Sequence, residues 1–295
     1  MEYICSDCPR RCKAPRGDGS PGGICRSPAL PRVSRAAAHF GEEPCISGQK
    51  GSGTIFFTGC NLRCVFCQNR EISRGGGSGR TVTTAQLRDM MLRLRDTGVH
   101  NINLVTGSHF TRPIAEALSA AKLDIPVVWN SSAYESPETL RLLDGLVQIY
   151  MPDYKYAKSD SAQRYSAAGD YPSVAVAAIK EMFRQTGPYV LGEDGILRSG
   201  VLIRHLILPQ QELSAMDVID FAAEEFPEGG VLFSLMGQYT PMPGLEAYPE
   251  LQERVSQETI ENLRSYMTRR GLEGYWQDAA SATDEMIPAF DLTGV

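Results

Sequence analysis

Three cysteines are grouped near residue 60 with a spacing that suggests metal chemistry. Cys60, Cys64 and Cys67 fall in the stretch GCNLRCVFCQN, which has the pattern C-x3-C-x2-C with Phe66 just before the third thiol. A structural zinc site usually has four ligands in two separated pairs, whereas three thiolates fit a [4Fe–4S] cluster whose fourth iron stays open. The spacing favours such a cluster. The alternative is a zinc site completed by Cys45 or a histidine.

A second group of cysteines lies at the N-terminus. The stretches CSDCPRRC and GGIC give the spacing C-x2-C-x3-C-x12-C, with a glycine-rich turn before the last thiol. Four thiolates in this arrangement can close a tetrahedral zinc site or hold a second, fully ligated cluster that feeds electrons to the first. Both interpretations stay open, with free thiols as a third. The predicted ligands are Cys5, Cys8, Cys12 and Cys25.

Composition and the N-terminal stretch restrict the possible roles of these thiols. The chain has 295 residues, 42% hydrophobic and 22% charged, which is typical of a globular protein. MEYICSDCPRRCKAPRG lacks the apolar core of a secretory signal, and no apolar run approaches the length of a membrane helix. We expect a cytoplasmic protein whose cysteines are metal ligands or reactive groups, not disulfides. Cys45 is expected to be a buried small residue, with a ligand or a reactive thiol as alternatives.

The overall charge argues against one class of partner. The formal net charge is −6 and the isoelectric point is near 5.4. An acidic chain of this kind does not present a surface that would bind a polyphosphate. No nucleic-acid partner is therefore expected.

Strands and helices alternate after the N-terminal quarter. TIFFT, residues 54–58, has the β-branched and aromatic character of a buried strand. Residues 83–98 then show helical spacing of apolar residues, with Thr83 or Thr84 as N-cap and Gly98 as terminator. The same pair recurs five times. The further strands are expected at 102–106, 126–130, 146–151, 201–208 and 231–235, and the further helices near 112–122, 136–144, 173–183, 214–225 and 250–269.

This alternation predicts an α/β fold with parallel strands. Six units without a dinucleotide-binding fingerprint favour a partial (β/α)6 barrel over an open doubly wound sheet. In both folds the chemistry lies at the carboxyl ends of the strands, where the three-cysteine loop falls. The expected organisation is a cysteine-rich extension over 1–50, the barrel over 51–272 and an irregular C-terminal tail over 273–295.

The three-cysteine stretch resembles the signature loop of the radical S-adenosylmethionine (SAM) superfamily, C-x3-C-x-Φ-C, with Phe66 as the aromatic residue. The chain is also similar along most of its length to relatives of pyruvate formate-lyase activating enzyme, through EEPCISG, GSGTIFFTGC, YMPDYKY and VLIRHLILP. The resemblance implies a radical-SAM-type barrel in which the three thiolates hold a [4Fe–4S] cluster. It further implies that the open iron binds SAM, which one electron splits into methionine and a 5′-deoxyadenosyl radical that abstracts a hydrogen atom.

The resemblance also implies roles for residues at the strand ends. Phe66 would pack near the adenine of SAM. Asp153 and Lys155, in MPDYK, match an Asp-x-Lys pattern; Asp153 would face the polar end of the cofactor or a monovalent cation, and Lys155 would pair with a carboxylate. The alternative is a purely structural ion-pair network at the barrel mouth. The other residues expected beside the cofactor are Asn130, Ser131 and Arg204.

One segment departs from the superfamily pattern. The second strand usually ends in a Gly-Gly-Glu segment that contacts the methionine amino group, whereas this chain has NLVTGSHF. Ser108 and His109 stand where the glutamate is expected, so Thr106, Ser108 or another acidic residue would supply the contact. His109 is either a proton-transfer group for the substrate or a structural residue.

Two classes of function follow. The first is a radical enzyme: either an activating enzyme that takes hydrogen from a backbone glycine of a glycyl radical enzyme, or a relative acting on a small molecule or peptide. Its partners would be SAM, an electron donor such as flavodoxin or ferredoxin and, for an activating enzyme, the glycyl radical enzyme. The second is a non-catalytic iron–sulfur or zinc protein, such as an electron carrier, which would not need so elaborate a barrel.

Overall fold

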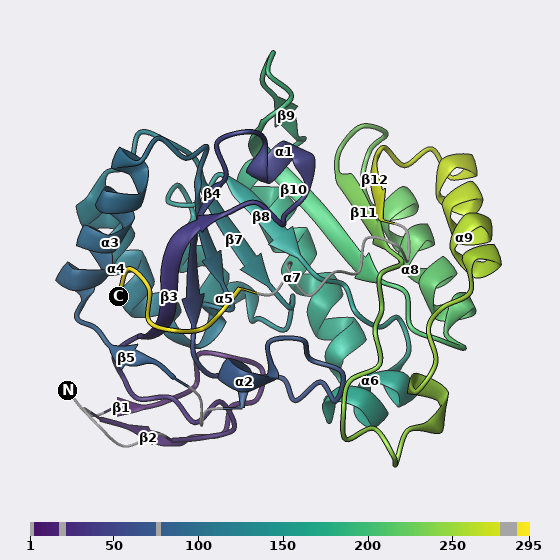
Figure 1. Ribbon diagram of the computed structural model, residues 1–295, viewed down its shortest axis with the longest axis horizontal. Coiled ribbons are helices and arrows are strands. Elements are labelled where there is room, and N and C mark those ends of the chain that lie inside the picture. Colours follow the sequence, from purple (N-terminus) through teal and green to yellow (C-terminus); the bar gives the residue numbers. More distant parts are fainter. Residues whose placement is uncertain (1–2, 18–21, 75–77, 278–287) are drawn as a thin grey trace.

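A ten-stranded, mostly parallel sheet forms the centre of the structure (Figure 1). The structure is a computed structural model and describes residues 3–17, 22–74, 78–277 and 288–295. Among these residues the strand order is β12-β11-β10-β8-β7-β6-β4-β3-β5, and β9 (Val190–Leu191) pairs with β10. The fold is therefore mixed α/β, as the alternating pattern predicts.

Seven of the described strands run parallel and follow one another in chain order across the sheet; six of them are the predicted ones, and the seventh is β12 (Gly274–Gln277). Each crossover therefore joins neighbouring strands, as predicted for successive βα units. The first four are buried along their whole length, in agreement with parallel strands that are covered on both faces. The six are β4 (Ser52–Phe57), β6 (Ile102–Val105), β7 (Val127–Ser131), β8 (Ile149–Pro152), β10 (Leu197–Leu206) and β11 (Leu232–Met236).

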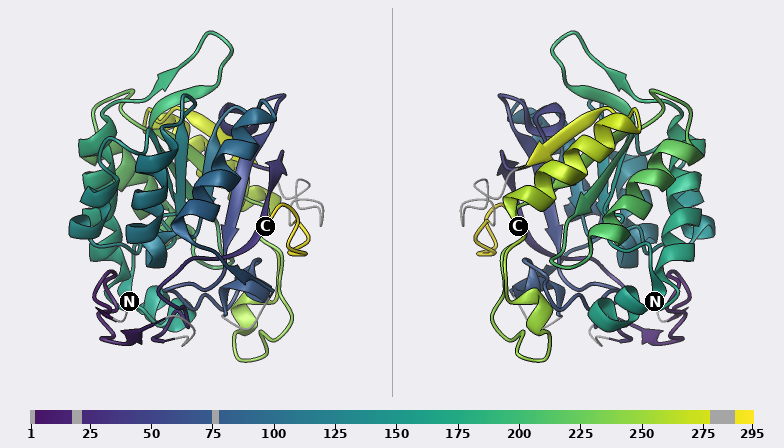
Figure 2. Two further views of the ribbon diagram at one scale, coloured as in Figure 1. Left: turned by 90° about the vertical axis from the view of Figure 1, so that its left-hand side faces the viewer. Right: turned by 90° about the vertical axis from the view of Figure 1, so that its right-hand side faces the viewer.

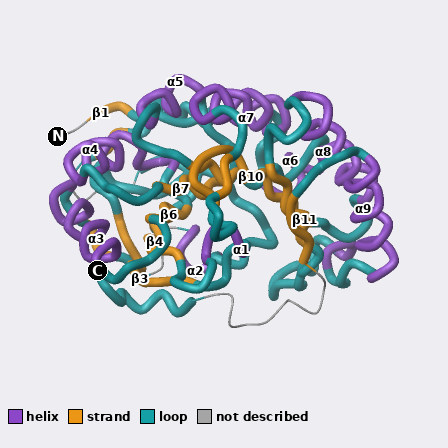
Figure 3. The backbone as a smooth tube through the Cα atoms, turned by 90° about the horizontal axis from the view of Figure 1, so that it is seen from above, coloured by secondary structure: helices purple, strands orange, loops and turns teal. Residues whose placement is uncertain are grey.

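Helices cover the outer face of this sheet (Figures 2 and 3). The first of them, α3, begins at Thr84 and is capped by Thr83 in a capping box. The Thr83 hydroxyl accepts from the Gln86 amide, and the Gln86 side chain accepts from the Thr83 amide. No helix among the described residues is both long and apolar enough to cross a membrane. The outer helices are α3 (Thr84–Asp96), α4 (Thr111–Ala121), α5 (Pro137–Leu140), α7 (Tyr171–Thr186), α8 (Glu212–Glu225) and α9 (Gln257–Arg269).

Several strands lie where the sequence predicts none, and two of them, β3 and β12, extend the main sheet by the greatest length. β3 (Arg32–His39) pairs antiparallel with β4 and with β5 (Arg80–Thr81), so part of the segment 1–50 belongs to the main sheet. β12 (Gly274–Gln277) pairs parallel with β11, within the stretch expected to be irregular. The three alanines of β3 are weak strand formers, and β12 has only four residues, none of them fully buried. Neither segment therefore has the pattern of a buried strand.

Two helical segments also differ from the expectation: one helix was not predicted, and another begins later than predicted. α6 (Ser159–Ser166) occupies a stretch expected to be a loop before α7. α9 begins at Gln257, not near 250, because Ser256 caps it by accepting from the Thr259 amide. The residues before that cap include a separate short 3-10 turn, η3 (Pro249–Leu251).

The sheet curves, and two short helices, α1 (Pro44–Ser47) and α2 (Arg70–Ser73), lie on its concave side near opposite ends of the strands (Figures 1 and 3). The two ends of the described sheet do not pair with each other. The C-terminal residues run beside β3, where the Leu292 amide donates to Ser34 O at 3.0 Å and the Ala36 amide donates to Thr293 O at 2.9 Å. Residues 278–287 of the expected tail lie outside the described residues.

The N-terminal segment forms a small two-stranded sheet, β1 (Tyr3–Ile4) with β2 (Pro15–Arg16), outside the main one. Asp7 ties this segment to the helical layer. Its carboxylate accepts from Arg112 Nε on α4 at 2.9 Å, and its carbonyl accepts from the Thr139 hydroxyl on α5 at 2.7 Å. The first residues are thus held against the same body that carries the main sheet.

Trp129, fully buried on β7, allows a test of the core. Its Nε1 donates to the buried Glu135 carboxylate at 2.9 Å. Replacing Trp129 by Phe leaves a void and removes a hydrogen bond to that carboxylate, so the free energy of unfolding should fall by about 2–5 kcal/mol in urea denaturation. Trp276→Phe is the control: its side chain is 44% exposed, and the loss should stay below about 1 kcal/mol. Equal losses in the two variants would contradict this account of the core.

Candidate active site

A single cavity of about 240 Å³ brings most of the predicted site residues together. Its walls come from the three-cysteine loop, from the segment before α1 and from the carboxyl ends of the parallel strands. This is the edge where a parallel α/β sheet places its chemistry. The predicted residues that line it are Cys60, Cys64, Phe66, Cys67, Thr106, Asn130, Ser131, Asp153, Lys155 and Arg204.

The three-cysteine loop starts at a glycine for which no other residue would fit. Gly59, directly after β4 and Thr58, has φ +94°, and a Cβ there would lie 2.7 Å from the carbonyl oxygen of Cys25. The loop therefore leaves the strand in tight contact with the N-terminal segment. Two hydroxyls support its thiols: Ser166 Oγ lies 3.0 Å from Cys64 Sγ, and Ser73 Oγ lies 3.4 Å from Cys67 Sγ.

Burial raises the pKa of the Cys60 thiol to about 12, and the nearby Cys64 adds to the effect. Burial likewise raises the pKa of Cys67. A thiophilic metal centre binds thiolates, so it would displace these protons on binding. The donor set of three adjacent sulfurs suits an iron–sulfur cluster better than a hard cation.

Phe66 forms the apolar part of the cavity wall. Its ring is 6% exposed and meets Tyr156 and Tyr239 edge to face, with ring centroids 6.3 Å apart in both pairs. Two flanking rings hold it in one orientation beside the thiols. A flat apolar ligand such as a nucleobase could pack there.

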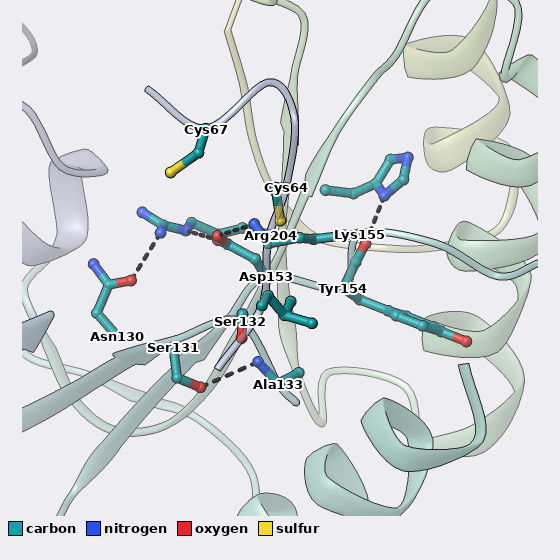
Figure 4. A network of polar contacts seen from close by, with 12 residues as sticks. Cys64, Cys67, Asn130, Ser131, Ser132, Ala133, Asp153, Tyr154, Lys155 and Arg204 are labelled. Carbon is teal, nitrogen blue, oxygen red and sulfur yellow. Dashed lines mark hydrogen bonds and ion pairs between the residues drawn. The ribbon is translucent and has the colours of Figure 1, made fainter. Parts of the chain in front are cut away.

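A partly buried ion-pair network faces the thiols, and Figure 4 shows Arg204 at its centre. Arg204 donates from Nε to Asp153 Oδ1 at 2.8 Å and from Nη2 to Asn130 Oδ1 at 2.9 Å. Lys155 Nζ donates to Asp153 Oδ2 at 2.8 Å. Burial opposes charge on Asp153, but Arg204 and Lys155 hold its pKa below the ordinary value. Burial likewise opposes charge on Lys155, yet Asp153 and the Cys64 thiol raise its pKa to about 12.

Two carboxylates that the sequence analysis did not assign complete the network. Glu42 accepts from Asn103 Nδ2 at 3.0 Å and Asn130 Nδ2 at 3.1 Å, and it pairs with Arg204 Nη1 at 2.8 Å. Glu43 also lines the cavity and is 1% exposed. Burial raises the pKa of its carboxyl, although Arg204 opposes the shift. The sequence feature that could have identified these two residues is the pair of adjacent acids in EEPCISG, a stretch noted only for its family likeness.

The end of the second parallel strand, β6, contributes Val105 and the following Thr106 to the lining. Thr106 has φ +60°, an unfavourable conformation for a β-branched residue, and its amide donates to Asn130 O at 2.8 Å. Ser108 lies outside the lining, beside Glu135. His109 is also outside it: burial lowers its pKa to about 3, and its Nε2 lies 3.0 Å from Thr58 O. His109 is therefore neutral and placed for packing, not for proton transfer in this cavity.

The N-terminal cysteines lie directly behind the three-cysteine loop. Cys8 is beside the Asn61 side chain, and Arg10 Nε donates to Asn61 O at 2.9 Å. The buried guanidinium of Arg16 donates from Nη2 to Cys25 Sγ at 2.8 Å. Three of these cysteines are buried and Cys12 is half-buried.

Across the described residues, no three Cys, His, Asp or Glu side chains already surround a point closely enough for a single metal ion. A metal at the N-terminal group would therefore have to draw its thiols together. Cys45, in contrast, is 1% exposed in an apolar cluster with Ile46 and Met151, which confirms the expectation of a buried small residue.

Comparison with known proteins agrees with this geometry. Residues 54–188 match the family model of the radical SAM superfamily, a range that includes most of β4, the three-cysteine loop, Asp153 and Lys155. This part of the chain belongs to the radical SAM superfamily. Members of the superfamily typically use a [4Fe–4S] cluster and SAM. The chain is also similar to the uncharacterized protein MJ0674 of Methanocaldococcus jannaschii, with 29% identity over 267 residues that cover 87% of this chain and 72% of the relative.

Proposed function

We propose that the protein is a radical SAM enzyme that reductively cleaves SAM and abstracts a hydrogen atom from a second substrate, on a sheet that is a partial (β/α)6 barrel. One observation carries the proposal: the three-cysteine loop, Phe66 and the charged network line the same cavity. When bound at the three thiolates, a [4Fe–4S] cluster would supply the electron that splits SAM into methionine and the 5′-deoxyadenosyl radical.

The residues of the cavity would divide the binding of SAM among them. Phe66 would pack against the adenine, since its ring is held between two others. Lys155 would pair with the SAM carboxylate, and Asp153 would keep Lys155 and Arg204 oriented through the ion pairs that it makes with both. The buried walls would keep water from the reacting groups. The residues proposed to contact SAM are Phe66, Thr106, Asn130, Ser131, Asp153, Lys155 and Arg204.

Loss of a thiol from the loop should abolish both metal loading and turnover. After anaerobic reconstitution and reduction, chemically or with flavodoxin, the native protein should convert SAM to 5′-deoxyadenosine. Cys64→Ala should lose the iron of this cluster and at least about 1000-fold of the rate, because two thiolates do not hold the cluster. Cys45→Ala, which removes a buried thiol outside the cavity, should keep both. A protein that binds zinc alone and leaves SAM intact would refute the proposal.

The substrate we favour is a backbone glycine of a partner glycyl radical enzyme, with flavodoxin or ferredoxin as electron donor. Two features support it: the likeness to pyruvate formate-lyase activating enzymes, and the two ends of the described sheet, which do not pair and so leave the barrel open at one side. An open side could admit a loop of a partner protein. The alternative substrate is a small molecule or a free peptide.

Electron paramagnetic resonance can separate the two substrates. The reduced protein with SAM should generate an organic radical on pyruvate formate-lyase, used as the probe. The signal should disappear when the target glycine of the probe is replaced by alanine. If SAM is cleaved but no radical forms on the probe, activation of that enzyme is excluded and a small-molecule or peptide substrate is favoured.

We further propose that the N-terminal cysteines hold a zinc ion or a second iron–sulfur cluster. Arg16 supports this, because its buried guanidinium contacts the Cys25 sulfur and a buried cation requires a negative partner. A centre formed by several thiolates would supply that charge. Its position behind the Cys60 loop would suit either bracing of the loop or electron transfer to it.

Metal analysis of a variant without the first cluster should reveal this centre. The triple replacement of Cys60, Cys64 and Cys67 by Ala should retain either about one zinc or about four irons per chain, depending on the metal. Adding Cys8→Ala and Cys25→Ala should remove them, whereas adding Cys45→Ala should not. A triple variant free of zinc and iron would show that the N-terminal thiols bind neither.

A further inference from the structure

Two buried hydroxyls face one sulfur of the three-cysteine loop. Ser166, the last residue of α6, is fully buried, and its Oγ lies 3.0 Å from Cys64 Sγ. The hydroxyl of Tyr156, a residue that is also buried, lies 2.7 Å from Ser166 Oγ and beside the same sulfur. Each hydroxyl has one proton. One of the two protons is used between the hydroxyls, so the other is available to the Cys64 sulfur.

The end of α6 that carries Ser166 is bonded to the three-cysteine loop through other atoms as well. The Val65 amide in the loop donates to Tyr165 O at 2.9 Å. Arg10 adds a second link, because its Nε donates to Asn61 O at 2.9 Å and its Nη2 donates to Ser166 O at 3.1 Å. The Ser166 hydroxyl is thus held beside the loop by hydrogen bonds that do not involve the thiol itself.

The other two thiols of the loop have more distant donors. The Leu62 amide lies 3.4 Å from Cys60 Sγ, and the hydroxyl of the half-buried Ser73 lies 3.4 Å from Cys67 Sγ. Of these three contacts, the one made by Ser166 is the shortest. It also lies where water is excluded, and a hydrogen bond is electrostatically stronger in such a place than in water.

Building on the proposed function, we propose that the Ser166 hydroxyl, supported by Tyr156, donates to the Cys64 thiolate when the cluster is bound and so raises its reduction potential. A thiolate has no proton and can only accept, which fixes the direction of the bond. One-electron reduction adds negative charge to the cluster and its sulfurs, so a donor stabilises the reduced form more than the oxidised form. Ser166 would act through Cys64, as a positioning residue that makes the cluster easier to reduce.

Potentiometric titration followed by electron paramagnetic resonance tests this role on the reconstituted protein. The signal of this cluster is the one that is absent from the triple alanine variant of the loop described above. Ser166→Ala should load the same amount of iron. Its one-electron reduction should become at least about threefold less favourable, a shift of about 30 mV toward more negative potential. Ser166→Thr, which keeps a hydroxyl, should titrate like the native protein.

Tyr156→Phe provides a second variant if Ser166→Ala does not load iron. It removes the hydroxyl beside Ser166 and keeps the ring that packs on Phe66, so the potential should shift in the same direction. Ser73→Ala is the matched control within the loop's own hydroxyl contacts. Its donor is more distant from the sulfur, so the shift should be smaller than in Ser166→Ala.

The inference is overturned if Ser166→Ala and Tyr156→Phe both titrate at the native potential, or if Ser166→Thr shifts as far as Ser166→Ala. These outcomes differ from failure of the proposed function. A cluster that assembles but leaves SAM intact would refute the enzyme assignment, and the potentials of the variants would still test Ser166. A native protein that binds no iron at the three thiols would refute both.

Discussion

The candidate site depends on one partly buried cation, the guanidinium of Arg204. It connects three segments that are far apart in the chain: Asp153 after β8, Asn130 on β7 and Glu42 before α1. Its fork of N–H donors has a fixed geometry, so the three partners are held at defined positions around it. Removing this cation would leave Glu42 and Glu43 without a basic partner, at a cost that reaches about 3–5 kcal/mol where the carboxylate is fully buried, as it is for Glu43. The same side chain therefore stabilises the interior of the curved sheet and shapes the cavity.

Such a network is suited to a ligand that carries both signs of charge. SAM, the ligand proposed above, has a carboxylate and a sulfonium, and Lys155 in the lining is the group proposed to pair with the carboxylate. Because the polar groups are already oriented by one another, little reorganisation is needed when the ligand binds. Phe66, fixed between two tyrosine rings, adds an apolar surface beside the thiols. The cavity is thus lined by the sulfur atoms of the loop, by the Phe66 ring and by charged side chains.

The N-terminal segment takes part in this arrangement although it precedes the main sheet. The segment is held against the loop that carries the three thiols by the close approach of Gly59 to Cys25 and by the hydrogen bond from Arg10 to Asn61. Asp7 anchors the same segment to α4 and α5. Binding of a metal by the N-terminal cysteines, or its loss, would therefore affect the position of the loop within a few residues of Cys60.

The sequence by itself indicated that the three-cysteine loop could bind a metal centre and that strands and helices alternate along the chain. Cysteine spacing is local, and buried parallel strands and capped helices such as the one from Thr84 leave strong patterns over a few residues. It also indicated that Asp153, Lys155 and Arg204 lie near the site, because each follows or lies within such a strand. Tertiary structure alone decided that Glu42 and Glu43 enter the cavity, that Ser108 and His109 do not, and that β3 and β12 extend the sheet. These outcomes depend on pairing between segments distant in sequence, and neither a weak strand such as β3 nor a pair of acids shows locally which partners it will meet.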